Sequence, residues 1–342
     1  MDVRLNSVRI DRESSRPNAC LVDGFGREID YLRLSVTDRC NLRCFYCMRD
    51  EVTFLPKREI LSLEEMERLA ASFVRLGVRK LRLTGGEPLV RPGVMGLIER
   101  LGVWVDSGEL DELTLTTNGT LLAGQAVALY AAGVRRINVS LDTLDEYVFR
   151  RITRREGLAD VLAGIDAVRA AGIAVRVNMV AMSGINDSEF DKVIRWCGDH
   201  DCDLALIEVM PLGLAADHYL PLNMVREHLM HRWQLIPVDD HTGGPARYWR
   251  VEETGCRLAF ITPMSHSFCA ECNRVRVTCT GRLVLCLGQR DGVDLRPALR
   301  ASEADVRLER EILSAIARKP AGHGFVSGRP CAEIRPMWQL GG

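Results

Sequence analysis

The chain has 342 residues, and its 45 Lys and Arg almost balance 46 Asp and Glu, for a formal net charge of -1. This balance excludes a global field that would draw the protein to nucleic acid or to a membrane surface, so any anion site must be local. No apolar run is long enough to span a bilayer, and residues 1–17 lack the apolar core of a signal peptide. We therefore expect a cytoplasmic protein with no nucleic-acid or membrane partner.

Twelve cysteines are present, and their distribution is uneven. Cytosolic thiols stay reduced, so clustered cysteines are more often metal ligands or catalysts than disulfide partners. One cluster is Cys40, Cys44 and Cys47, and a second is Cys269, Cys272, Cys279 and Cys286. The scattered cysteines are interpreted as small buried hydrophobes, namely Cys20, Cys197, Cys202, Cys256 and Cys331.

In chain order, residues 1–27 are predicted to be a weakly structured lead-in, and residues 28–212 alternate strand-like and helix-like segments. Gly77, Gly133 and Gly172 each stand where a left-handed residue would end a helix. This alternation predicts an α/β fold, a parallel sheet with helical cover, arranged as a partial (βα)6 TIM-like barrel or an open sheet, because a complete eightfold barrel takes about 250 residues. The predicted strands are 31–36, 80–84, 112–118, 135–142, 174–180 and 203–210.

Each predicted strand has one apolar face, which should pack on the helices. The opposite face carries polar groups, although the interior of a closed barrel is normally filled with branched hydrophobes. Burying such groups unpaired costs several kcal/mol each, so we expect a lumen that is wet or filled by an anionic ligand. The polar face is predicted to consist of Arg33, Ser35, Arg82, Thr84, Thr114, Thr116, Asn138, Ser140, Arg176, Asn178, Glu208 and Met210.

Beyond residue 212 the pattern changes to a loop, a helix and antiparallel strands, which predicts a C-terminal α+β region over residues 213–342. Within it, residues 273–288 read as a hairpin that turns at Thr280 and Gly281. The second cysteine cluster flanks this hairpin. A four-cysteine zinc site that includes Cys279 is an open alternative at this point.

The first cluster has the spacing Cys-x3-Cys-x2-Cys and follows a predicted strand, so it lies at the carboxyl end of the sheet, where α/β proteins bind ligands. Three thiolates can hold three corners of a cubane iron–sulfur cluster, whereas structural zinc sites use four ligands. The spacing therefore favours an iron–sulfur cluster with one open iron over zinc.

Cys40-x3-Cys44-x-Tyr46-Cys47 resembles the signature of the radical S-adenosylmethionine (SAM) superfamily. The resemblance implies a [4Fe-4S] cluster whose fourth iron chelates SAM, and a 5′-deoxyadenosyl radical formed on reduction. "TGGEPLV" (84–90), "NVSLD" (138–142) and "IEVMPLG" (207–213) resemble further SAM-contacting segments. By this resemblance, Gly86, Ser140 and Met210 are expected to contact SAM, together with Tyr46 of the first motif. A core methionine is the alternative for Met210.

Cys269-x2-Cys272-x13-Cys286, with Asn273-Arg274-Val275-Arg276 after its second cysteine, resembles the GTP 3′,8-cyclase family of molybdenum cofactor biosynthesis. "LRLSVTDRCN", "LTTNG" and a carboxy-terminal Gly-Gly are also similar to that family. The resemblance implies a second [4Fe-4S] cluster that contacts GTP. The radical would take hydrogen from ribose C3′, and closure onto guanine C8 would give 3′,8-cyclo-7,8-dihydro-GTP.

The resemblance also implies a GTP site made of Arg33, Arg82, Thr116, Arg176, Arg274, Val275 and Arg276. Arginine suits a triphosphate because its planar fork makes bidentate, charge-assisted hydrogen bonds. Ion pairing with barrel carboxylates such as Glu87 or Glu208 is the alternative for these arginines. Gly341 and Gly342 are expected to form a tail that reaches the site and is needed for the radical chemistry.

Two other function classes compete with this interpretation. One is a peptide-modifying radical SAM enzyme with an auxiliary cluster, and the other is a zinc or nucleic-acid-binding protein, which the neutral charge disfavours. For the cyclase, the expected protein partners are a flavodoxin- or ferredoxin-like reductant and the next cofactor enzyme, cyclic pyranopterin monophosphate synthase. The sequence leaves a homodimer open.

Overall fold

The computed structural model describes residues 20–48, 51–211, 213–239, 246–266, 268–289, 291–325 and 337–340. Its first six strands alternate with helices, as the sequence predicts. They are β1 (Tyr31–Ser35), β2 (Lys80–Thr84), β3 (Glu112–Thr117), β4 (Arg136–Ser140), β5 (Ala174–Ala181) and β6 (Asp203–Glu208). The helices of this part are α1 (Leu63–Arg75), α2 (Val94–Asp106), α3 (Ala126–Ala131), α4 (Glu146–Thr153), α5 (Leu158–Ala170) and α6 (Phe190–Asp199).

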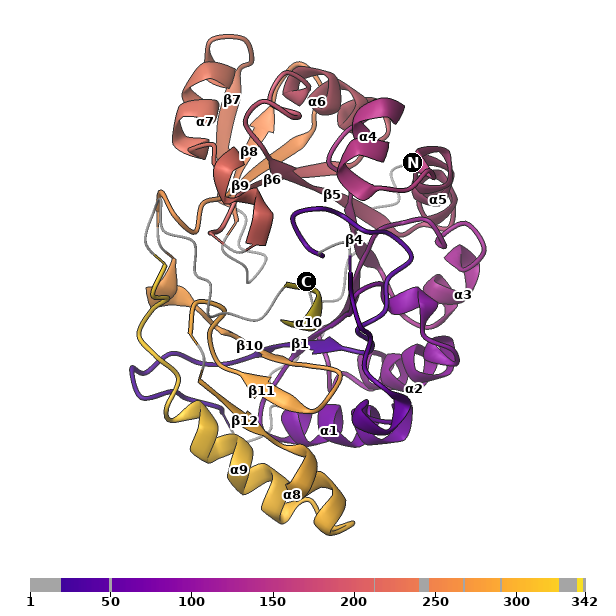
Figure 1. Cartoon of the computed structure of the whole chain (residues 1–342), viewed down its shortest axis with the longest axis vertical. Helices are drawn as coiled ribbons and strands as arrows, with labels where there is room; N and C mark the ends of the chain where they lie inside the picture. Colours follow the sequence, from indigo (N-terminus) through magenta and orange to yellow (C-terminus); the bar gives the residue numbers. More distant parts are fainter. Residues whose placement is uncertain are drawn as a thin grey trace, which may run out of the picture.

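These six strands are parallel and lie side by side in chain order. The sheet curves, its helices cover the outer face, and the short helix α10 (Met337–Leu340) lies inside the curve (Figure 1). The two edge strands of the sheet do not pair with each other, so the curve stays open. The predicted α/β fold with a partial (βα)6 barrel is confirmed.

The predicted helix boundaries also agree with the structure. The Ser62 hydroxyl accepts from the Glu65 amide, and the Glu65 carboxylate accepts from the Ser62 amide, which closes the capping box at the start of α1. Gly77, Gly133 and Gly172 follow α1, α3 and α5 with φ of 109°, 82° and 86°. A left-handed residue at these points ends each helix and directs the chain into the next strand.

The strands after residue 212 extend the same sheet at both of its edges. They are β7 (Leu235–Val238), β8 (Arg247–Val251), β9 (Arg257–Ile261), β10 (Arg274–Val277), β11 (Arg282–Val284) and β12 (Gly292–Asp294). β9 joins β6 and β10 joins β1, both in parallel, and the remaining strands add antiparallel to them. The order is β12-β11-β10-β1-β2-β3-β4-β5-β6-β9-β8-β7.

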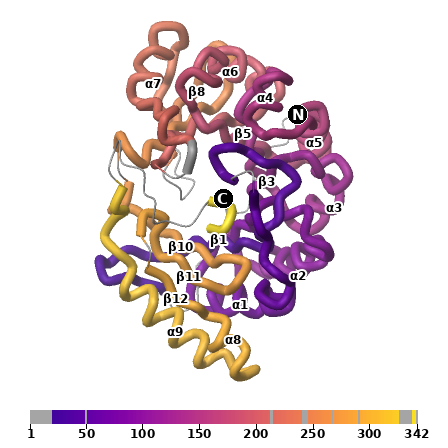
Figure 2. Tube along the Cα trace, in the orientation of Figure 1, coloured from indigo at the N-terminus to yellow at the C-terminus, as the bar shows by residue number. Residues whose placement is uncertain are grey.

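The predicted hairpin at Gly281 and the predicted antiparallel pair near residue 250 are therefore present. What the sequence pattern did not indicate is that each pair contributes one parallel strand to the barrel. The tube in Figure 2 shows the C-terminal segments divided between the two ends of the curve, with α7 (Leu222–Met230) at one end and α8 (Arg296–Ala301) and α9 (Val306–Ile316) at the other.

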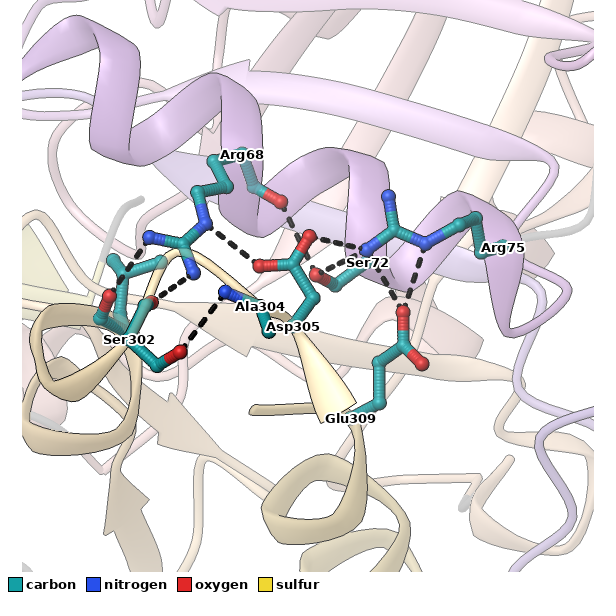
Figure 3. Close-up of polar contacts among 8 residues, drawn as sticks. Arg68, Ser72, Arg75, Ser302, Ala304, Asp305 and Glu309 are labelled. Atoms are coloured by element: carbon teal, nitrogen blue, oxygen red, sulfur yellow. Dashed lines mark hydrogen bonds and ion pairs between the residues drawn. The ribbon is translucent and has the colours of Figure 1, made fainter. Parts of the chain in front are cut away.

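Helix α9 is held against α1 by a network of ion pairs (Figure 3). Asp305, at the start of α9, accepts from Arg68 at 2.7 Å and from Arg75 at 2.6 Å, and Arg75 also pairs with Glu309 at 2.8 Å. Arg68 donates further to the Leu299 carbonyl at 3.0 Å. These contacts attach the C-terminal helices to the first helix of the barrel.

The predicted lead-in is only partly described, because residues 1–19 lie outside the described part of the chain. Residues 20–27 are not weakly structured. Leu21 is buried, and Asp23 and Arg27 are linked by a buried ion pair of 2.6 Å. A short hydrophilic stretch looks like a loose terminus, but these two charges are ordered by partners near residues 269 and 320, far away in the sequence.

No described helix combines the length and the apolar character needed to cross a membrane.

Candidate active site

A large cavity opens inside the curved sheet, with an empty volume of about 2230 Å³ that includes the part open to solvent. Residues of β1 to β6, of β10 and of the loops at the carboxyl strand ends line it. The cavity brings together the described residues that were predicted to form the site: Arg33, Cys40, Cys44, Tyr46, Cys47, Arg82, Gly86, Thr116, Ser140, Arg176, Met210, Cys269, Cys272, Arg274, Val275, Arg276 and Cys286.

The sheet register explains why the polar residues share this cavity. Arg33 lies beside Arg82 on β2 and beside Arg276 on β10, while Thr116 lies beside Asn138. Asn138 in turn lies beside Arg176 on β5. Because register partners in a parallel sheet point to the same face, these side chains form one inner layer.

Glu208 and Met210, the two residues of this segment that were predicted to face inward, both line the cavity, but alternation along β6 is not the reason. Arg176 lies beside Asp203 and Asn178 beside Ala205, so the residues with odd numbers face inward on β6. Leu204 and Leu206 pack in the core with the outer helices. Met210 follows the end of the strand, where the alternation no longer applies, and it lines the cavity. Residues 204–207 in the middle of β6 are all apolar, so periodicity could not assign the inner face of this strand.

Cys40, Cys44 and Cys47 lie on the loop after β1, at the carboxyl end of the sheet. The backbone of this loop is held by α4, because the Arg43 amide donates to the Thr153 carbonyl at 2.9 Å and the Phe45 amide to the Ile152 carbonyl at 3.0 Å. The three thiols thus line one wall of the cavity on a fixed loop.

The surroundings of these three thiols raise their pKa values. Burial raises the pKa of Cys47 to about 12, and it raises the pKa of Cys44 well above the ordinary value, with Asp142 adding to the effect. Burial also raises the pKa of Cys40. Burial therefore disfavours the thiolate form of all three cysteines, which does not suit free nucleophiles.

The segment Gly85-Gly86-Glu87 after β2 is joined to the same loop. The Gly86 amide donates to the Thr37 carbonyl and the Glu87 amide to the Arg39 carbonyl, each at 2.8 Å. A Cβ on Gly86 would lie 2.3 Å from the Arg39 carbonyl oxygen. Only glycine allows this approach of two backbones, so Gly86 has a packing role beside its predicted contact with SAM.

Tyr46 is held by Asp142, a partner that the sequence did not reveal. The Tyr46 hydroxyl donates to Asp142 at 2.8 Å, and the other oxygen of that carboxylate accepts from the Val180 amide at 2.8 Å. Burial raises the pKa of Asp142 to about 6. Asp142 is the last residue of the segment 138–142 that contains Ser140. Its place in this segment is the one feature of the sequence that could have identified it.

Four arginines line the cavity from neighbouring strands: Arg33 on β1, Arg82 on β2, and Arg274 and Arg276 on β10. Arg82 and Arg276 are buried. Burial lowers the pKa of Arg82 to about 9 and lowers that of Arg276 well below its usual value, with Arg33 and Arg274 adding repulsion. Burial would raise the pKa of Tyr31, which lies among these arginines, but Arg82 and Arg33 outweigh burial and lower it. Positive charges this close together repel one another, and an anion that binds among them would stabilise them.

Arg176 lies on β5 across the cavity. It is 5% exposed, and its contact with Asp203 is long at 3.8 Å, because Asp203 is already engaged by Arg257 at 2.6 Å. The guanidinium lies over the Tyr248 ring, 5.1 Å from its centroid. In the described structure its Nε has no hydrogen-bond partner, so Arg176 keeps donors for a ligand.

Ion pairing with Glu87 or Glu208, the alternative role for these arginines, is not found among the described contacts. Glu87 accepts from Thr117, Asn118 and Leu89. Glu208 accepts from the Met264 and Ser265 amides at 2.8 and 2.9 Å. Both carboxylates tie loops together and leave the guanidiniums to the cavity.

Cys269, Cys272 and Cys286 line the cavity on the side of β10, and Cys279 does not. Cys279 is 2% exposed and packs in the main hydrophobic core. Within the described residues, no three His, Cys, Asp or Glu side chains lie close enough to share a single metal ion. The core position of Cys279 counts against a four-cysteine zinc site that includes it and leaves three cysteines that a larger cluster could bridge.

The C-terminal helix α10 reaches this cavity as well. Met337 lines it, and Trp338 is buried with its ring 6.0 Å from that of Phe54. A backbone hydrogen bond from the Trp338 position reaches Cys47. Gly341 and Gly342 lie outside the described residues.

Lys319 and Arg27 are further residues near the second cysteine group that sequence reasoning missed. Lys319 lines the cavity and donates to Cys272 Sγ at 3.4 Å, and Arg27 donates to the Cys269 carbonyl at 2.6 Å. Neither residue belongs to a recognised motif, and each is far from the cysteines in sequence. Only the tertiary structure brings them there.

Comparison with protein families gives two matches along the chain. Residues 34–197 match the Radical SAM superfamily, and residues 202–325 match Molybdenum Cofactor Synthesis C. Among solved structures, Streptococcus suis SuiB has a TM-score of 0.59 at 15% identity, covering 87% of this chain and 68% of that chain, which shows a shared fold.

Curated relatives are much more similar. A GTP 3′,8-cyclase of Rhizobium meliloti is 54% identical over 333 residues, covering 95% of each chain. One of Nitrobacter hamburgensis is 56% identical over 313 residues, covering 90% of this chain and 91% of the relative. The chain therefore belongs to the GTP 3′,8-cyclase family of the radical SAM superfamily.

Proposed function

We propose that the cavity holds SAM at the Cys40 loop and GTP among the arginines, with the guanine base at the second cysteine group. The chain is a radical SAM enzyme and a GTP 3′,8-cyclase of molybdenum cofactor biosynthesis. The observation that carries the proposed site is the single cavity lined by two groups of three cysteines and by Arg33, Arg82, Arg176, Arg274 and Arg276.

In this proposal Cys40, Cys44 and Cys47 hold the first [4Fe-4S] cluster. When bound, that cluster supplies the electron that splits SAM into methionine and a 5′-deoxyadenosyl radical. Gly86 and Tyr46 shape the SAM side of the cavity, together with Ser140 and Met210.

The arginines orient GTP for the reaction. Charge-assisted hydrogen bonds from Arg33, Arg82 and Arg176 would fix the triphosphate, and Thr116 lies beside them on β3. With the phosphates fixed, ribose C3′ would face the SAM side. Loss of the C3′ hydrogen to the 5′-deoxyadenosyl radical lets C3′ bond to guanine C8, and one electron and one proton complete 3′,8-cyclo-7,8-dihydro-GTP.

Cys269, Cys272 and Cys286 would hold a second [4Fe-4S] cluster with an open iron toward guanine. Arg274, Val275 and Arg276 follow on β10 and line the same wall. The tail at Gly341 and Gly342 would complete the site, which the position of α10 at the cavity supports. The reaction takes up external electrons, so we propose a flavodoxin- or ferredoxin-like reductant and transfer of the product to cyclic pyranopterin monophosphate synthase.

Two measurements test this function. Anaerobic incubation with GTP, SAM and dithionite, followed by mass analysis of the nucleotide, is expected to give the cyclic dihydro product and 5′-deoxyadenosine. Iron analysis of the reconstituted chain is expected to give about eight irons and no stoichiometric zinc. Four irons with one zinc would refute the second cluster, and unchanged GTP in an enzyme that cleaves SAM would refute the assigned substrate site.

A further inference from the structure

Lys319 is a buried ammonium with no carboxylate in reach. It is 3% exposed, and none of the ion pairs among the described residues involves it. Its Nζ donates to the Leu285 carbonyl at 3.1 Å and to Cys272 Sγ at 3.4 Å. Lysine is almost never fully buried without a partner of opposite charge, because leaving water costs its charged form several kcal/mol.

The lysine is held in this place by a network that comes from three parts of the chain. Arg27 donates to the Pro320 carbonyl at 2.6 Å and to the Ala321 carbonyl at 2.9 Å, and the same guanidinium reaches the Cys269 carbonyl. Asp23 accepts from Arg27 at 2.6 Å. One buried arginine therefore links the segment that follows Lys319 to the loop that carries the second cysteine group.

A second contact fixes the same segment on its other side. The Gln289 side chain donates to the Gly322 carbonyl at 2.9 Å, and His323 Nε2 lies 2.9 Å from the Pro263 carbonyl oxygen. The segment after Lys319 is thus fixed by contacts of the Arg27, Gln289 and His323 side chains with backbone carbonyls, and this segment holds the lysine in place. Such a fixed charge can act on a neighbouring group without reorganising.

The anion that this lysine faces is the second cysteine group. Three thiolates carry negative charge, and reduction of a cluster adds one more. A positive charge and an N–H···S hydrogen bond at one sulfur stabilise the reduced form more than the oxidised form, so they raise the reduction potential.

We infer that Lys319 is a positioning residue that holds the Cys272 sulfur and sets the reduction potential of the second cluster. This inference rests on the proposed second cluster. It assigns to Lys319 a role separate from GTP binding, and one that favours acceptance of an electron on the substrate side of the cavity.

The test uses the full chain with Cys40, Cys44 and Cys47 replaced by alanine, so that only the second cluster remains. Its midpoint potential is measured by EPR-monitored titration without GTP, for the lysine and for Lys319→Met, Lys319→Gln and Lys319→Arg. Lys192→Met is the control, because Lys192 also donates to a backbone carbonyl but is exposed and does not line the cavity.

We expect Lys319→Met to lower the midpoint potential of the second cluster by about 59 mV. For a one-electron couple, this shift makes the ratio of reduced to oxidised cluster about tenfold smaller at a given applied potential. Lys319→Arg and Lys192→Met should keep the original potential, and Lys319→Gln should lie between them and the methionine variant. If the methionine variant does not hold iron, the inference is tested by comparing the midpoint potentials of the Lys319→Gln and Lys319→Arg variants. Equal potentials in Gln and Arg variants that hold four irons would overturn the inference. Absence of iron before any change at Lys319 would instead refute the second cluster.

Discussion

Arg176 shows how a charge is kept available inside a protein. Its nearest carboxylate, Asp203, is drawn away by Arg257, and its own contact with Asp203 is 3.8 Å long. Burial lowers the pKa of Arg176, with a partly opposing effect of Tyr248. The buried guanidinium gains most of its stabilisation only when an anion such as a triphosphate enters the cavity.

Replacing Arg176 by alanine should therefore weaken GTP binding and leave guanosine binding nearly unchanged. Loss of a charge-assisted hydrogen bond costs about 1.5–3 kcal/mol, which is a loss of affinity of about 10- to 100-fold. Anaerobic equilibrium dialysis with both ligands measures the difference. Arg150→Ala is a suitable control, because the Arg150 side chain is 69% exposed. Equal losses for GTP and guanosine would contradict a phosphate contact.

At the scale of elements, the Cys40 loop is a composite of three segments. The loop after β1 is hydrogen-bonded to the end of α4 and to the glycine segment after β2. Each of the three segments contributes backbone hydrogen bonds that hold the loop. The loop is therefore as rigid as the packing between β1, β2 and α4.

Gly86→Ala should prevent this packing, because the new Cβ would meet the Arg39 carbonyl oxygen at 2.3 Å, and backbone must shift to relieve the clash. We expect the first cluster to be lost and the reconstituted chain to keep about four of its eight irons. Gly124→Ala is the matched control, since a Cβ there meets nothing within 4 Å. Full iron content with normal SAM cleavage in Gly86→Ala would show that the close approach is not required.

The contact between α1 and α9 gives a second prediction at this scale. Asp305 pairs with two arginines, and its side chain is only 19% exposed (Figure 3). We expect Asp305→Ala to lower the free energy of unfolding by about 1 kcal/mol, since Arg75 is half exposed and screened by solvent. Urea denaturation measures this loss, and the exposed Glu303→Ala serves as its control. An unchanged unfolding midpoint would mean that apolar packing alone docks α9.

At the scale of the whole molecule, the C-terminal region completes the cavity of the candidate active site by joining the barrel. β10 pairs with β1, so the second cysteine group and Arg274 and Arg276 reach the cavity that the first six strands enclose. Two halves of the sequence thus face each other across one cavity. This arrangement predicts that the two cysteine groups carry separable activities.

Cys272→Ala should separate them. The first cysteine group stays intact, so we expect 5′-deoxyadenosine still to form, but without the cyclic nucleotide because the second cluster would not assemble. Cys44→Ala should abolish both products. Chromatography of nucleosides and mass analysis of the nucleotide distinguish these outcomes, and Cys20→Ala, whose thiol is exposed and away from the cavity, is the control. Unchanged cyclisation in Cys272→Ala would exclude a role for the second group.

Much of this fold could be read from the sequence because its signals are local. Alternation of side chains gave the six strands and the inner layer, since a strand places every second residue on one face. Alternation does not hold within β6, where residues 204–207 are all apolar, and there the register with β5 decides which side chains face inward. The ordered residues 20–27 were also missed, because Arg27, which pairs with Asp23, gains its other partners from the far end of the chain.

The sequence by itself determined the chemistry: the cysteine spacing, the glycine segment and the arginines on alternate strand positions are short-range patterns that require no knowledge of the fold. The tertiary structure alone decided which cysteines face the cavity, that Cys279 lies in the core, and that Lys319 reaches Cys272. The reason is physical, because a contact between residues 47 positions apart depends on how strands pair and helices pack, and nothing in the local sequence encodes that distance.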